Sequence, residues 1–289
     1  MKYEINDLNL LGDWINIKRQ ELTAKGHNTT GLADDKVGVL YFSYLKRSLT
    51  QKPRNIKKST VFTCPTELEN GLDILEGKII AGEDLTPYLS KGINRLTYQD
   101  KMLFDWGIHH LHLGEVVGSS GFIARTGPVL YARFDDDNAY FIQVLHHGHW
   151  SNKQLIETLH DNWPETLSAF RLPENRTLST NFNDSEIGEL RDINVNTLLQ
   201  LNDGTVYLGL GGGVAASGDS IDSVERYLDT QWKFKELEKN INENTDKYIP
   251  NDDLPIATPL KFILIRHLNG LYYLHETNND WYTQIVGPQ

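Results

Sequence analysis

Most of the histidines lie in one part of the sequence, which makes that part the best candidate for proton transfer or metal binding. Seven of the chain's ten histidines fall between His109 and His160, and six of these form two groups that lie within Phe104–Gly114 and Val144–Trp150. Imidazole changes its charge near neutral pH and can accept a proton, donate one or bind a transition metal. These two groups therefore supply the candidate functional residues.

The spacing of the histidines allows a metal site. His110 and His112 are two residues apart, as are His147 and His149, so each pair shares one side of a strand. Four imidazoles from adjacent strand ends could bind zinc or another divalent transition metal, with oxygen donors from Asp135–Asp137. This arrangement would suit a metal-dependent hydrolase with a His-x-His site. The competing interpretation is that the rings are partly buried at strand ends and hydrogen-bonded to the backbone.

Metal-free cleavage of a phosphodiester is a second possible chemistry. Cleaving RNA requires a base for the 2′-hydroxyl proton, an acid for the leaving oxygen and a cation for the phosphorane charge. The first two roles suit histidine, with His112, His147 and His149 as candidates, and the third suits Arg125 or Arg133. No cofactor is required for this mechanism.

The segment that carries these residues resembles a known family. Gly121–His149 contains an arginine-bearing strand, an acidic turn and an apolar strand that ends in histidines. This pattern is similar to the sheet core of the RelE/HigB-type toxin endoribonucleases, over about residues 104–163. The resemblance implies that Arg133 corresponds to the arginine of the central strand, and His147 or His149 to the basic group that ends the next strand. It also implies a toxin or phage-defence role, RNA as the substrate and an antitoxin as a protein partner.

A basic run precedes this region. Lys46–Lys58 holds six basic side chains and no acidic one, in a chain whose formal net charge is −11. The run is expected to be either a solvated loop or a loop that contacts phosphate, and in the second case Lys52, Arg54, Lys57 and Lys58 would bind RNA.

Residue periodicity predicts the elements that position the histidines. A strand around Ile108–Leu113 is expected, followed by a hairpin of Pro128–Phe134 and Ala139–Leu145 across an acidic turn. Ser151 is expected to cap a helix that ends before Pro164. The apolar face of that helix would hold four residues: Leu155, Ile156, Leu159 and Trp163.

The flanking regions complete an expected α+β fold. The first hundred residues favour helices over about Leu8–Gly26 and Asp34–Leu49, a third from Pro65 and a short helical passage from Thr86 to Leu103. After a loop from about Leu172 to Glu186, further elements are expected: a hairpin turning at Asn202–Gly204, a helix with Ile221, Val224, Leu228 and Trp232 on its apolar face, and a hairpin over Phe262–Leu274. We therefore expect a helical region at 1–102, a His-rich sheet core at 103–170 and an acidic α+β region at 187–289.

Composition limits the protein's class. One cysteine, Cys64, fits a reducing cytosol, and neither a signal-peptide pattern nor an apolar run of roughly 20 residues is present. A cytoplasmic protein without a membrane partner is expected. The negative net charge opposes broad attraction to nucleic acid, although a local basic patch can still act. A non-catalytic interaction protein is therefore a third functional class.

Overall fold

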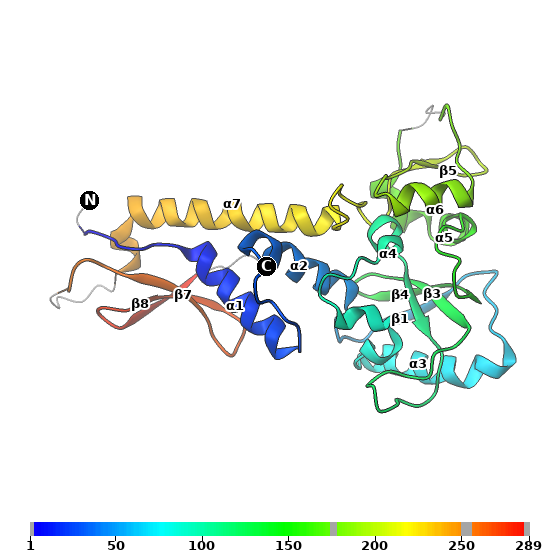
Figure 1. Cartoon of the computed structure of the whole chain (residues 1–289), viewed down its shortest axis with the longest axis horizontal. Coiled ribbons are helices and arrows are strands. Elements are labelled where there is room, and N and C mark those ends of the chain that lie inside the picture. The colour runs from blue at the N-terminus through cyan, green and yellow to red at the C-terminus, as the bar shows by residue number, and fades with distance from the viewer. Residues whose placement is uncertain (1–2, 174–177, 250–255, 286–289) are drawn as a thin grey trace. The chain divides into compact units, whose positions relative to one another are not determined.

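The computed structural model describes residues 3–173, 178–249 and 256–285 and shows an α+β protein, as expected (Figure 1). The chain forms two compact units. One comprises residues 1–42 and 224–289, and the other residues 43–223. The expected region boundaries near residues 102 and 170 both lie inside the second unit.

A four-stranded sheet forms the centre of the second unit. Its strands are β1 (Asn55–Lys58), β2 (His109–His112), β3 (Pro128–Phe134) and β4 (Asn138–His146), in the order β1-β4-β3-β2. The β3–β4 hairpin is confirmed, with a register shift after Tyr131. The expectation that the whole basic run is a loop was wrong, because residues 55–58 pair in parallel with β4 at the sheet's edge.

Helices cover both faces of this sheet. Leu72, Leu75 and Ile79 of α3 (Glu69–Ala81) pack against one face. Leu155, Ile156 and Leu159 of α5 (Gln154–Asn162) pack against the other with Trp163, which confirms the expected apolar face. Paired residues in an antiparallel sheet point to the same side. His110 and His112 therefore share the α5 side with their partners Tyr131 and Val129.

The segments around the sheet follow the expected order with differences at their ends. η1 (Thr66–Leu68) leads into α3, and η2 (Thr86–Tyr88), η3 (Lys91–Asn94) and α4 (Lys101–Trp106) form the short helical passage before β2. Ser151 does not cap α5, which begins three residues later and has no side-chain cap. The helix ends at Asn162, and Pro164 begins η4 (Pro164–Phe170).

The remaining part of the second unit contains one helix that periodicity did not reveal. α6 (Asp184–Asp192) is stabilised by a capping box between Asn183 and Glu186, inside the stretch expected to be a loop. Residues 174–177 of that stretch lie outside the described residues. The hairpin at Asn202–Gly204 is present but short, with β5 (Leu199–Gln200) and β6 (Val206–Tyr207).

The first unit is built on α1 (Leu10–Ala24), the larger parts of α2 (Asp34–Arg47) and α7 (Ile221–Glu243), η5 (Thr245–Tyr248) and a three-stranded antiparallel sheet. That sheet adds β9 (Trp281–Ile285) to the expected hairpin of β7 (Phe262–Arg266) and β8 (Tyr272–Glu276). The predicted apolar face of α7 was wrong in part. Leu228 and Trp232 are 55% and 62% exposed, whereas Tyr227 and Phe234 are buried.

Among the described helices, none is both long and apolar enough to cross a membrane.

Candidate active site

Three histidine rings meet at one end of the central sheet. The ring centroids of His110 and His112 are 6.3 Å apart, and His147 lies 5.8 Å from each of them. Trp150 completes the group, with its ring centroid 4.7 Å from that of His110 and 4.5 Å from that of His147. We call these four residues the histidine cluster. It joins β2 to the loop between β4 and α5.

A pocket of about 710 Å³ opens beside the cluster. His110, His147 and Trp150 line it, together with residues of the segment before α4 and of α6. The charged groups in this lining include Asp100, Lys101, Glu189 and Arg191. The pocket therefore combines imidazoles, carboxylates, cations and an aromatic ring.

The two inner histidines are neutral at pH 7. Burial, reinforced by neighbouring positive charge, lowers the pKa of His110 to about 4 and that of His112 to about 3. His112 accepts a hydrogen bond at Nδ1 from the backbone N–H of Thr126 at 3.2 Å, so its proton lies on Nε2. Neither ring can act as a general acid near neutral pH.

His147 is the exposed member of the cluster. Its pKa is lowered from 6.5, first by desolvation and then by the charge of Arg125. A neutral, accessible imidazole near its titration range is suited to accept a proton.

The pKa of Asp100 is shifted in the opposite direction to those of the histidines. Its carboxyl caps α4 by accepting a hydrogen bond from the N–H of Leu103 at 3.1 Å. The residue keeps some exposed surface, yet the surrounding protein atoms desolvate the carboxyl and raise its pKa from 3.8 to about 6, against the opposing charges of Arg47 and Arg191. Near pH 6 this carboxyl can hold a proton that it could donate.

Arg191 and Tyr131 hold the loop that carries His147. The Arg191 guanidinium is 5% exposed, pairs with Asp105 at 2.7 Å, stacks over Trp106 and donates to the carbonyl oxygen of Trp150. The hydroxyl of Tyr131 accepts a hydrogen bond from the N–H of His149 at 3.2 Å. The pair with Arg191 does not outweigh desolvation at Asp105, whose pKa is raised.

Arg125 lies close enough to influence the whole cluster. Its charge contributes to the lowered pKa of His110, His112 and His147. The guanidinium is exposed and donates from Nη1 to the carbonyl oxygen of Leu89 at 2.9 Å. Of the two arginines selected from the sequence, this one lies within electrostatic range of the cluster, although it is not among the residues that line the pocket.

Arg133 and His149 do not join the cluster. The Arg133 guanidinium lies elsewhere, where Nη1 donates to the carbonyl oxygens of Trp106 and Leu210, each at 3.3 Å. A Cβ atom on Gly107, whose φ is +69°, would come within 3.0 Å of the same nitrogen. The His149 side chain is exposed and makes no ring contact with the cluster within the described part of the chain.

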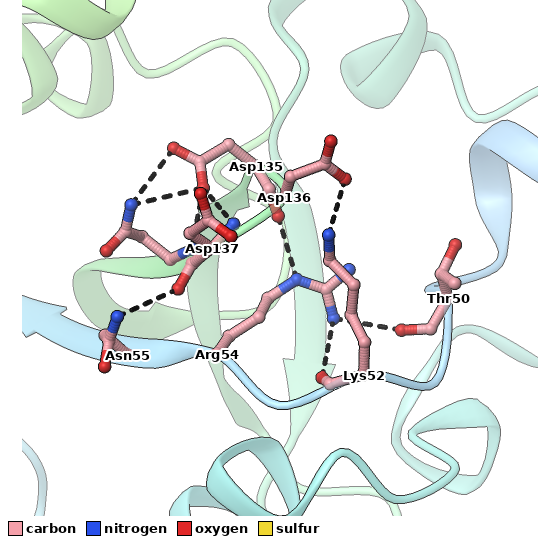
Figure 2. Close-up of polar contacts among 8 residues, drawn as sticks. Thr50, Lys52, Arg54, Asn55, Asp135, Asp136 and Asp137 are labelled. Carbon is pink, nitrogen blue, oxygen red and sulfur yellow. Dashed lines mark hydrogen bonds and ion pairs between the residues drawn. The ribbon is translucent and has the colours of Figure 1, made fainter.

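The basic run contacts the acidic turn of the β3–β4 hairpin. Figure 2 shows Lys52 paired with Asp136 at 2.7 Å and Arg54 donating from Nε to the carbonyl oxygen of Asp135 at 2.8 Å. Arg54 is only 8% exposed. In β1, which follows directly, Lys58 pairs with Glu76 at 2.6 Å, and Lys57 lies over the Tyr140 ring at 5.8 Å. These four cations therefore have partners within the protein.

The four-histidine metal set is not assembled. No group of three or more His, Cys, Asp or Glu side chains in the described ranges is arranged to hold a metal ion. His110, His112 and His147 are close together, but His149 does not approach them, and Asp135 lies in the turn that contacts the basic run.

Sequence reasoning missed Asp100, Trp150, Glu189 and Arg191. Asp100 precedes a short helix and could have been recognised as a cap. Glu189 and Arg191 lie on α6, just beyond the expected loop of about Leu172–Glu186, where no helix was predicted, so nothing in the local sequence brought them to the histidines.

Comparisons of the chain with protein-family models, with curated proteins and with solved structures returned no match.

Proposed function

We propose that the second unit is a metal-independent endoribonuclease of a toxin or phage-defence type, with its active site in the pocket beside the histidine cluster. The observation that carries this proposal is the presence of His147 and Asp100 in one pocket with pKa values displaced in opposite directions. Such a pair can provide a general base and a general acid together.

The residue roles follow from this arrangement. His147 takes the proton of the 2′-hydroxyl, Asp100 protonates the leaving 5′-oxygen, and Arg125 stabilises negative charge on the phosphorane. His110 and His112 stay neutral and support the ring of His147. RNA suits this set because its own 2′-hydroxyl is the nucleophile, so the protein has only to move protons and offset charge.

We further propose that the enzyme acts in the cytoplasm and that a protein partner of the antitoxin kind restrains it. The single cysteine agrees with a reducing compartment. Because the basic run is paired with the acidic turn, we expect RNA to bind at the pocket and its rim.

The test uses the full chain with an end-labelled RNA in EDTA, beside a DNA of the same sequence. We expect cleavage of the RNA alone, because the DNA lacks the attacking hydroxyl. Intact RNA, cleavage that needs an added metal ion, or equal cleavage of the DNA would contradict the proposal.

A further inference from the structure

Acidic side chains line a pocket that we have proposed to bind a polyanion. Glu189 and Asp192, both exposed on α6, belong to the lining. Carboxylates repel a phosphate, but they accept hydrogen bonds well from the N–H groups on the edge of a nucleobase. Their presence is consistent with RNA if they face a base.

Glu189 is a carboxylate of the pocket lining with a hydrogen-bond partner in the same lining. Its Oε1 accepts a long hydrogen bond from the hydroxyl of Ser185 at 3.3 Å, one turn earlier on α6, and Ser185 also lines the pocket. The backbone carbonyl of Asp192 accepts from Lys101 Nζ at 2.7 Å, which holds the end of α6 beside the segment that begins α4. The helix that carries Glu189 is therefore fixed at its end by a hydrogen bond to the segment that begins α4.

His110 is a second polar side chain of the pocket. It is 7% exposed, and its Nδ1 is buried and makes no hydrogen bond within the described part of the protein, so a bound base would have to meet its other ring nitrogen, Nε2. Its low pKa keeps the ring neutral. A neutral imidazole has one N–H donor and can therefore donate to a carbonyl oxygen.

Trp150 adds an aromatic surface. Trp150 is partly exposed and lines the pocket together with His147, Gly148 and residues of α6. Unpaired RNA bases commonly stack on such rings while their Watson–Crick edges are read by hydrogen bonds.

Only one common base matches this combination. Guanine presents two adjacent donors, N1–H and the N2 amino group, beside the acceptor O6. A carboxylate can accept from both donors at once, whereas adenine, cytosine and uracil do not offer that adjacent pair. We propose that this pocket binds a guanine base: Glu189 accepts from N1 and N2, His110 donates to O6, and the base stacks on Trp150.

This inference rests on the proposed function for the identity of the polymer, but binding of the base can be tested without cleavage. The probes are guanosine, inosine and adenosine 3′-monophosphates, titrated into the full chain by calorimetry. We expect the guanosine nucleotide to bind at least about tenfold more tightly than inosine 3′-monophosphate, which lacks the N2 amino group, and than adenosine 3′-monophosphate.

Two variants test whether the Glu189 carboxylate causes the preference for guanosine. Glu189→Gln should abolish the preference for guanosine over inosine, because the neutral amide cannot accept from both donors. Glu115→Gln, which changes an exposed residue outside the pocket lining, should leave the preference unchanged. Equal binding of the three nucleotides, or an unchanged preference in Glu189→Gln, would overturn the inference.

The outcomes also separate this inference from the proposed function. Guanosine-selective binding with intact RNA would support the base site and overturn the endoribonuclease. RNA cleavage without selectivity for guanosine, in binding and in the cleaved positions, would support the endoribonuclease and overturn the base site.

Discussion

Asp100 has a structural and a chemical property at one position. Its carboxyl oxygen accepts the N–H of Leu103 and so caps α4, and its raised pKa allows it to hold a proton near pH 6. Asparagine caps helices as well as aspartate does but does not titrate. The two properties can therefore be separated by one substitution.

The pH dependence of cleavage should reflect Asp100 and His147. His147 must be neutral to act as a base, so the rate rises as pH increases through its lowered pKa. Asp100 must be protonated to act as an acid, so the rate falls as pH increases above about 6. We predict a mildly acidic optimum, and a loss of about a hundredfold or more in kcat for Asp100→Asn.

Asp100→Asn should lower activity, but it should raise stability at neutral pH. The folded-state pKa of Asp100 is raised, so its contribution to stability is fully present below 3.8 and is lost as pH rises through about 6. Asp100→Asn should remove that loss, and denaturant unfolding at pH 5 and pH 7 measures it. An inactive variant that is also much less stable at pH 7 would indicate a structural role alone.

Packing of α3 against the sheet depends on a glycine that sequence reasoning did not single out. A Cβ atom on Gly71 would come within 1.9 Å of the backbone oxygen of Leu113, just beyond β2. Because the obstacle is backbone, relieving the clash would require α3 or the end of β2 to shift.

Gly71→Ala should therefore lower the free energy of unfolding by about 1–3 kcal/mol through overpacking. Gly77→Ala in the same helix is a matched control, since a Cβ atom there meets nothing within 4 Å. That substitution should stabilise the protein by up to about 1 kcal/mol, as alanine is the better helix former. Equal effects of the two substitutions in urea unfolding would contradict this account of the packing.

Local sequence patterns predicted the helices and strands better than they predicted which of them pair or pack together. Periodicity located α1, α2, the β3–β4 hairpin and the buried face of α5, because each depends on residues close in sequence. The parallel pairing of β1 with β4 joins Asn55 to Asn138, and no local signal encodes such a contact.

The face of α7 illustrates a related limit. Its helical period was recognised, but Leu228 and Trp232 are exposed while Tyr227 and Phe234 are buried. Periodicity alone leaves open which of two apolar stripes packs against other elements.

At the candidate site, too, the sequence indicated the residue types and their strands but not the contacts of each side chain. The sequence raised the possibility that histidines from two segments meet and left open whether they do, and in the structure His110, His112 and His147 lie together. Arg133 has the expected residue type on the expected strand, yet backbone carbonyls hold its guanidinium elsewhere.

At the scale of the whole chain, charge is distributed so that the basic run is largely compensated inside the protein. Lys52 and Arg54 contact a turn 81 or more residues away in sequence, and Lys58 contacts α3. In a chain with a formal net charge of −11, this pairing leaves Arg125 as the exposed cation whose charge reaches the histidine cluster. RNA binding should therefore rely on the pocket more than on long-range attraction.

The most direct measurement is single-turnover RNA cleavage in EDTA by the full chain and two histidine variants. His147→Gln removes the proposed base, whereas His149→Gln changes an exposed histidine two residues away that does not join the cluster. We predict that the first variant loses at least about a hundredfold in rate and that the second keeps the rate of the unmodified protein. Equal rates for all three proteins, or a loss confined to His149→Gln, would contradict the assignment of this pocket as the active site.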